Sequence, residues 1–110
     1  MKIYSDNAKR YEIINVDAKE VVKRYANGKR NFRLTDLKGL NLVKANLSSV
    51  DFTGANLSGS NLSNSDLSHA NLNWAILKGA NLSGANLKGA KMPDGRMHND
   101  YLESANYFGI

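Results

Sequence analysis

The chain has 110 residues and a net charge of +5, with 42% apolar residues, 8% aromatic residues, one proline and no cysteine. A chain of this length forms one domain around one core. The lack of cysteine excludes disulfides, thiolate metal sites and thiol nucleophiles, and the lack of any apolar run of about 18 residues excludes a membrane-spanning helix. We therefore expect a soluble, cytoplasmic protein that does not enter a membrane.

The basic residues are concentrated near the start of the chain. Residues 1–33 hold nine Lys or Arg and four acidic residues, whereas residues 34–110 hold six of each sign. The excess of positive charge therefore belongs to the N-terminal segment, and the remainder of the chain is neutral.

Residues 1–29 are expected to form an N-terminal segment made of a strand and a capping helix. Tyr11 to Val16 is rich in residues that favour strands, and it is expected to pair at one edge of the domain. Asp17 to Glu20 has the spacing of a capping box, and Gly28 is a stop signal, so a helix is expected over residues 18 to 27. The apolar face of that helix would hold Val21, Val22 and Tyr25.

A five-residue period begins at Phe32 and runs without a slip to Met92. An apolar residue stands at each of the thirteen centres: Phe32, Leu37, Leu42, Leu47, Phe52, Leu57, Leu62, Leu67, Leu72, Leu77, Leu82, Leu87 and Met92. Two places before most centres stands a small residue, and the exceptions Arg30 and Leu40 predict an imperfect first coil. Asn or Asp precedes eleven of the thirteen centres, and Gly is frequent two places after. A period of five fits neither a helix nor a straight strand, so the chain must turn once in every unit.

The repeat resembles that of the pentapeptide-repeat family, A(D/N)LXX, and it is matched residue for residue by Ala55–Gly59 and Ala85–Gly89. The resemblance implies an all-β solenoid over residues 30–94, a right-handed quadrilateral β-helix of about three coils with four pentapeptides per coil. A coil of four pentapeptides places Phe32 and Phe52 on one face, where they are expected to touch. The Met-Pro-Asp-Gly stretch at residues 92–95 resembles the end of many short bacterial members of the family.

Proline at position 93, with the following Asp and Gly, predicts a turn that ends the repeat. Residues 95–110 are then expected to form a C-terminal tail. Its apolar residues, among them Tyr107 and Phe108, favour folding back under the last coil over contact with another molecule.

Residues that could carry catalysis or hold a metal do not form a recognisable constellation in the sequence. His69 and His98 lack a second ligand at metal-binding spacing, and no serine has the context of a triad nucleophile. Asp36, Asp51 and Asp66 stand where Asn usually stands, which favours a role in turn formation over paired-carboxylate chemistry. The sequence therefore predicts no cofactor, no metal and no enzymatic activity.

Trp74 is the sole tryptophan, and it occupies a corner position where Gly, Ser or Asn is usual, which should leave it at least partly exposed. Aromatic residues are enriched at interface hot spots, so Trp74 is the best candidate for a partner contact, although it could simply lean on a neighbouring coil. Ile76 also breaks the Asn/Asp pattern next to it. We take Trp74, Ile76, Lys78, Tyr107 and Phe108 as possible partner contacts.

The sequence favours a non-catalytic structural or protein-interaction module, a monomer or homodimer with an unidentified protein partner. An alternative is binding of nucleic acid or an acidic surface through a basic surface made of Lys19, Lys23, Arg24, Lys29, Arg30 and Arg33. No aromatic stacking platform accompanies these charges, which argues against nucleic acid. A third alternative, a DNA mimic that modulates a topoisomerase, is implied only by the family resemblance. It requires a long acidic rod, and this chain is short and basic.

Overall fold

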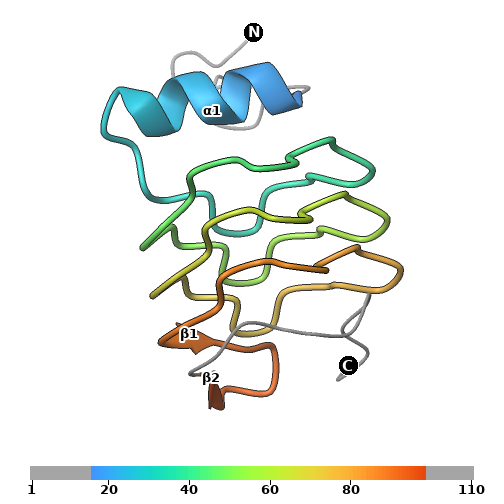
Figure 1. The fold of residues 1–110 in the computed structure, drawn as a ribbon. Coiled ribbons are helices and arrows are strands. Elements are labelled where there is room, and N and C mark those ends of the chain that lie inside the picture. Colours follow the sequence, from blue (N-terminus) through green and yellow to red (C-terminus); the bar gives the residue numbers. More distant parts are fainter. Residues whose placement is uncertain (1–15, 99–110) are drawn as a thin grey trace, which may run out of the picture.

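The structure, a computed structural model, describes residues 16–98. It contains helix α1 (Ala18–Ala26) followed by a long coiled segment and two short strands, β1 (Ala90–Lys91) and β2 (Met97–His98). The helix lies across one end of a stack of coils, and the two strands lie at the other end (Figure 1). The helix therefore covers the first coil, as the sequence predicts.

Each coil of the stack consists of four five-residue units. Single parallel bridges join each residue that precedes a centre to the corresponding residue of the next coil, beginning with Asn31 and Asp51 and ending with Asn71 and Lys91. Backbone bonds follow the same step: Phe32 N–H donates to Asp51 O at 2.8 Å. Each unit thus lies on the unit four places further along the chain.

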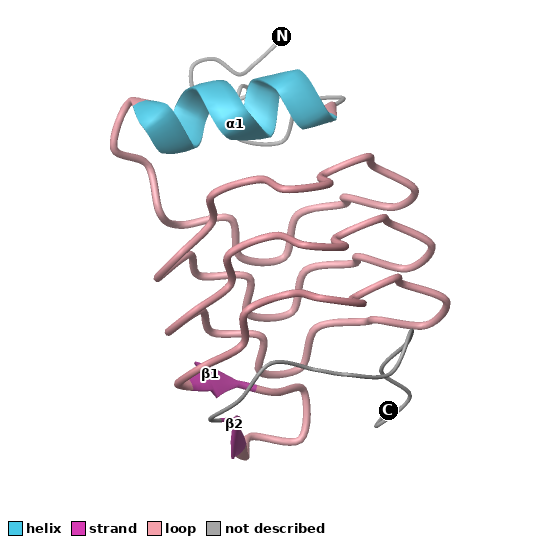
Figure 2. Ribbon diagram, viewed as in Figure 1, coloured by secondary structure: helices cyan, strands magenta, loops and turns pink. Residues whose placement is uncertain are grey.

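The predicted solenoid contains little regular strand in the described residues. Between α1 and β1 the structure has turns and isolated bridges in place of extended strands (Figure 2). The turn in every unit explains this finding, because it leaves each side of the coil too short for more than one bridge.

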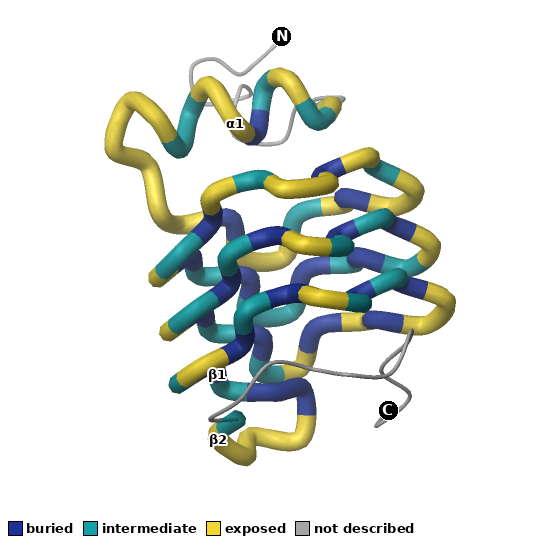
Figure 3. The backbone as a smooth tube through the Cα atoms, in the orientation of Figure 1, coloured by how far each residue is buried: buried dark blue, intermediate teal, exposed yellow. Residues whose placement is uncertain are grey.

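Buried residues recur along each coil of the stack (Figure 3), and their apolar side chains form the core. All thirteen centres from Phe32 to Met92 are buried, and most are inaccessible to solvent. Phe32 and Phe52 meet edge to face with ring centroids 5.9 Å apart, which confirms the predicted contact. The small inward residues are buried from Val50 onward, whereas Arg30 is exposed and Leu40 and Ala45 are half-buried, as expected for an imperfect first coil.

Asparagine and aspartate form the turns. Each of the eleven Asn or Asp residues that precede a centre accepts, through Oδ1, a hydrogen bond from the backbone N–H two residues later, at 2.9 to 3.3 Å. This bond fixes the bend between successive inward residues. The interpretation of Asp36, Asp51 and Asp66 as turn formers is therefore confirmed.

At each corner of the coil, where one unit meets the next, the backbone adopts the left-handed conformation. The residue two places after each of the first twelve centres has φ between 57° and 73°. Glycine adopts this conformation without steric cost, and it occupies six of these corners. The other six corners carry side chains: Leu34, Lys44, Ser49, Asn64, His69 and Trp74.

The helix starts where the sequence predicts, and one of its side chains donates a hydrogen bond to a backbone carbonyl at the edge of the first coil. Asp17 Oδ1 accepts a 2.9 Å bond from Glu20 N–H, which caps the helix. Val21 is buried, and the Tyr25 hydroxyl donates to Ser48 O at 2.7 Å. One part of the prediction was wrong: Val22 is 47% exposed, because residues 21 and 25 share a helix face and residue 22 lies about 100° around it.

The predicted turn after Met92 is confirmed, and it leads into a hairpin that the sequence analysis did not foresee. Gly95 N–H donates to Met92 O, and β1 pairs antiparallel with β2 in the register Ala90 to His98. Pro93 is buried, and its carbonyl still accepts a 3.1 Å bond from Trp74 N–H. Hydrogen bonding between successive coils therefore continues as far as Pro93, and the chain reverses direction after it.

Candidate interaction surfaces

Two features of the described surface could bind a partner: an apolar corner in the coils and a depression beside the helix. We call the first the Trp74 corner, made of Leu34, Trp74, Ile76 and Lys78. The second, the helix-end depression, is lined by Ala18, Lys19, Val22, Lys23 and Asn41.

The Trp74 corner exposes large apolar side chains to solvent. Trp74 is 74% exposed, which confirms that it faces solvent, and Ile76 is 47% exposed. Trp74 also holds φ at 65°, a conformation that is unfavourable for a bulky side chain. Nothing in the coil forces an aromatic residue here, because glycine occupies half of the equivalent corners.

Leu34 belongs to the same corner and was missed in the sequence analysis. It is 79% exposed and has φ of 57°, and it stands at the same corner as Trp74, two coils earlier. A Cβ added to Gly54, the corner between them, would collide with Leu34 Cδ2, so Leu34 extends toward the second coil. The signal was available in the register, because positions 34, 54 and 74 share one corner of the four-unit coil.

The basic residues between Lys19 and Arg33, within the described part of the chain, do not form one free surface. Arg24 Nε bonds Glu20 Oε2 at 2.7 Å. The guanidinium of Arg30 stacks on the Tyr25 ring at 3.7 Å and donates to Tyr25 O. Lys29 lies over the Phe32 ring at 5.6 Å, and Arg33 is 4.0 Å from Asp51.

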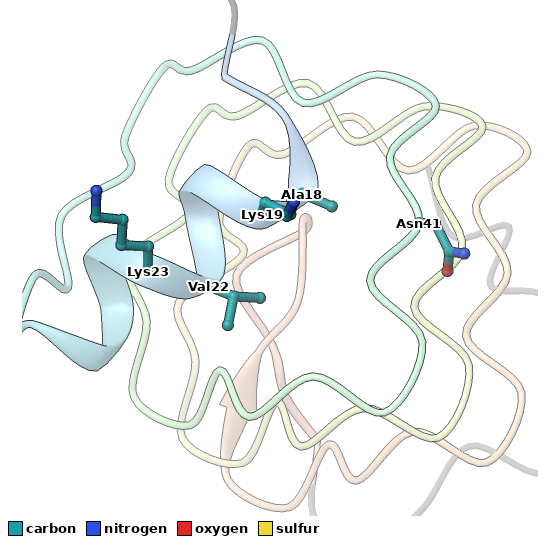
Figure 4. Close-up of a pocket in the computed structure, with 5 residues that line it drawn as sticks. All are labelled: Ala18, Lys19, Val22, Lys23 and Asn41. Atoms are coloured by element: carbon teal, nitrogen blue, oxygen red, sulfur yellow. The ribbon is translucent and has the colours of Figure 1, made fainter.

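Lys19 and Lys23 differ from those residues, because they line the helix-end depression. The depression has a volume of about 480 Å³ and an apolar lining, with Val22 and Ala18 on the helix side and Asn41 across from them on the first coil (Figure 4). Neither lysine forms an ion pair with another described residue. The lining of the depression is thus mainly apolar, and the Lys23 ammonium points away from Asn41 (Figure 4).

Within residues 16–98, no group of three His, Cys, Asp or Glu residues is arranged to hold a metal ion. His69 is an exposed corner residue whose ring lies beside Gly89. Tyr107 and Phe108, the other predicted partner contacts, lie outside the described residues. No helix in the described part of the chain is long and apolar enough to cross a membrane.

Four-unit coils with Asn or Asp turns and left-handed corners define a class of protein, the solenoids built from five-residue repeats. Two overlapping stretches, residues 31–68 and 65–99, match the sequence profile "Pentapeptide repeats", with eight copies. Because the match covers more than half of the chain, the protein belongs to the pentapeptide-repeat family. Membership implies that the coils form the right-handed quadrilateral β-helix of that family.

Several solved structures are similar. HetL, a pentapeptide-repeat protein involved in heterocyst differentiation regulation in the cyanobacterium Nostoc, is 38% identical over 62% of this chain and 36% of its own, with a TM-score of 0.39. A second Nostoc protein, alr5209, is 34% identical over 69% of this chain and 75% of its own, with a TM-score of 0.34. A pentapeptide-repeat protein of the Arabidopsis thaliana thylakoid lumen is 29% identical over 62% of this chain and 55% of its own, with a TM-score of 0.33. The chain thus spans only part of each of these proteins, and no curated protein sequence matches it.

Proposed function

We propose that this protein is a non-catalytic interaction module that binds a protein partner through the Trp74 corner. The observation that carries the proposal is the exposure of Trp74, together with Leu34 and Ile76, on an otherwise polar wall. Pentapeptide-repeat proteins are generally structural or interaction modules. We also propose the division into an N-terminal segment (1–29), a repeat domain (30–94) and a C-terminal tail (95–110).

The physical support for this surface comes from solvation and backbone conformation together. Contiguous exposed apolar side chains are unfavourable in a protein that works alone, and they typify sites of association. Trp74 in the left-handed conformation carries a conformational cost, and its side chain does not pack in the core. A favourable contribution to binding a partner is the simplest reason for its presence.

The alternative basic surface receives less support. Of the six residues assigned to it, Arg24, Arg30 and Lys29 contact other groups of the protein. The DNA-mimic alternative conflicts with a net charge of +5. We therefore propose a protein partner rather than nucleic acid.

Affinity capture from cells that carry this protein tests the proposal. Wild type, Trp74→Ala and Asn64→Ala are compared, because Asn64 is also a left-handed corner residue and lies half a coil away from position 74. We expect a protein that is retained by wild type and Asn64→Ala and lost with Trp74→Ala. Equal recovery with all three proteins would show that the Trp74 corner is not the binding surface.

A further inference from the structure

The hydrogen bonds between coils are unequal in direction. In each unit of the second coil, the N–H groups of the centre and of the corner donate to the third coil, as those of Leu57 and Gly59 do. The N–H of the residue before the centre donates back to the first coil, as that of Asn56 does. The other two N–H groups of that unit, those of Ser58 and Ser60, bond within it. Each unit therefore leaves one net peptide dipole along the stack, with its positive end toward β1 and β2.

These dipoles make the two ends of the stack electrically different. Four units share a coil, and coils lie about 4.8 Å apart, so one net dipole falls on about every 1.2 Å of the stack. An α-helix has one dipole per about 1.5 Å and carries roughly half an elementary charge at each end, so the stack carries a similar charge. The end that faces α1 is negative, and the hairpin end, at β1 and β2, is positive (Figure 1).

Basic side chains reinforce the positive end. Residues 77–98 hold one acid, Asp94, and four basic residues, Lys78, Lys88, Lys91 and Arg96, whereas residues 34–76 hold two basic and three acidic residues. Asp94 lies 3.6 Å from Arg96. Neither Lys88 nor Lys91 forms an ion pair with another residue between positions 16 and 98. Backbone and side chains thus both make the hairpin end positive.

The segment that follows the hairpin carries the opposite charge. Residues 99–110 contain Asp100 and Glu103 and no Lys, Arg or His. Lys91 faces Met97 in the pairing of β1 with β2. Asp100 and Glu103 come three and six residues after Met97, which is at most about 10 Å and about 20 Å of extended chain. Both carboxylates are therefore tethered within reach of the basic side chains of the last coil.

We propose that the hairpin end of the stack is an anion-binding surface and that residues 99–110 of the same chain occupy it in the free protein. Asp100 and Glu103 pair with Lys88 and Lys91 beside the positive end of the stack. The covalent link keeps the local concentration of these carboxylates high, so exposed ion pairs suffice to hold the segment. Release of the segment uncovers the edge of the last coil, so the contact is an autoinhibitory cover over that end.

This proposal stands apart from the Trp74 corner. Lys88 and Lys91 do not belong to that corner, and the proposal does not depend on a partner that binds there. Loss of partner binding through Trp74→Ala would leave the cover untouched, and failure of the cover would leave the Trp74 corner untouched.

A spin label on the acidic segment tests where it lies. The chain has no cysteine, so Ser104→Cys in the full-length protein gives a single attachment point for a nitroxide. We expect the nitroxide to broaden the amide signals of Lys88 and Lys91 several-fold more than those of α1. A mixture of nitroxide-labelled protein and isotope-labelled protein without nitroxide should show no broadening. Equal broadening at the two ends, or broadening in the mixture, would overturn the proposal, since the segment would then lie elsewhere or on a second copy.

Neutral variants of the spin-labelled protein separate charge from apolar contact. Asp100→Asn/Glu103→Gln and Lys88→Gln/Lys91→Gln should each reduce the broadening at the amides of residues 88 and 91 several-fold. A salt concentration of about 1 M, where the screening length is about 3 Å, should have the same effect.

Asp36→Asn and Lys44→Gln are the matched controls, because each removes one charge from the first coil. Both should leave the broadening unchanged. The proposal is overturned if either double variant also leaves it unchanged, because the segment would then be held by its apolar side chains, or if the controls reduce it as much as the double variants do.

Discussion

At the scale of single residues, the choice between glycine and another residue at each left-handed corner affects the stability of the fold. Half of the twelve corners carry glycine and half carry a side chain, so the fold tolerates the strain of an L-residue without needing it. The left-handed conformation costs a non-glycine residue roughly 1–2 kcal/mol. Each non-glycine residue at a corner therefore lowers the free energy of unfolding by a small but measurable amount.

Trp74→Gly is expected to raise the free energy of unfolding by about 1 kcal/mol, because glycine removes the left-handed strain while nothing buried is lost. Trp74→Ala keeps the strain and is expected to be near neutral. Urea denaturation followed by circular dichroism measures both changes. If both variants lose more than about 1 kcal/mol, Trp74 packs on the coils in solution and is not free to bind a partner.

The corners occupied by glycine differ in the space that they leave for an added Cβ atom. A Cβ at Gly59 meets nothing within 4 Å, whereas a Cβ at Gly84 would collide with the side-chain amide of Asn64 in the coil before it. Gly59→Ala should therefore cost about 1–2 kcal/mol from the conformation alone, and Gly84→Ala should cost more. Denaturation of both variants gives the comparison.

The double variant Asn64→Gly/Gly84→Ala isolates the collision. Removal of the Asn64 side chain should return the cost of alanine at position 84 to that of Gly59→Ala. A loss at position 84 that does not change when Asn64 is removed would contradict the proposed contact between the two corners.

At the scale of elements, the helix caps the first coil, and its Tyr25 hydroxyl contacts both the carbonyl and the hydroxyl of Ser48. Tyr25→Phe removes the hydroxyl that donates to Ser48 O and leaves that carbonyl without its partner, so we expect a loss of about 1 kcal/mol. Thermal unfolding measures the loss. Ser48→Ala is the control, because it deletes the Ser48 hydroxyl and keeps the carbonyl, and it should cost less than Tyr25→Phe.

The interior ladders carry most of the stability of the coils. Leu67 is fully buried in the middle of the stack, and Leu67→Ala is expected to cost about 2–5 kcal/mol. Ser65→Ala nearby should be close to neutral, since alanine is the usual residue at that inward position. A small effect of Leu67→Ala in chemical denaturation would mean that the ladders are loosely packed.

The elements that the sequence predicted well are those fixed by the period of five. The period of five, with the four units per coil that the family resemblance implies, placed Phe32 against Phe52. The same period assigned the turn role to Asn and Asp and placed Trp74 at an exposed corner. The features it missed depend on three-dimensional placement. Leu34 is recognised as part of the Trp74 corner only when the coils are stacked. Val22 is exposed because α1 turns the face of Val21 and Tyr25 toward the first coil, and the sequence alone does not show which face that is.

At the scale of the whole molecule, the positive charge does not amount to a nucleic-acid surface. Three of the six basic residues in question are engaged by Glu20, Tyr25 and Phe32. Sedimentation of the protein with a short DNA duplex at two salt concentrations should therefore show no salt-sensitive complex. A shift that vanishes at high salt would restore the basic surface as a binding site.

The central claim is that a partner contacts the Trp74 corner, and photo-crosslinking in living cells tests it most directly. The photoreactive amino acid benzoylphenylalanine is placed at position 74 in one protein and at position 64, on the opposite corner, in another. We predict a crosslinked protein partner from position 74 and none from position 64. No crosslink from position 74, or the same crosslinks from both positions, would contradict the claim.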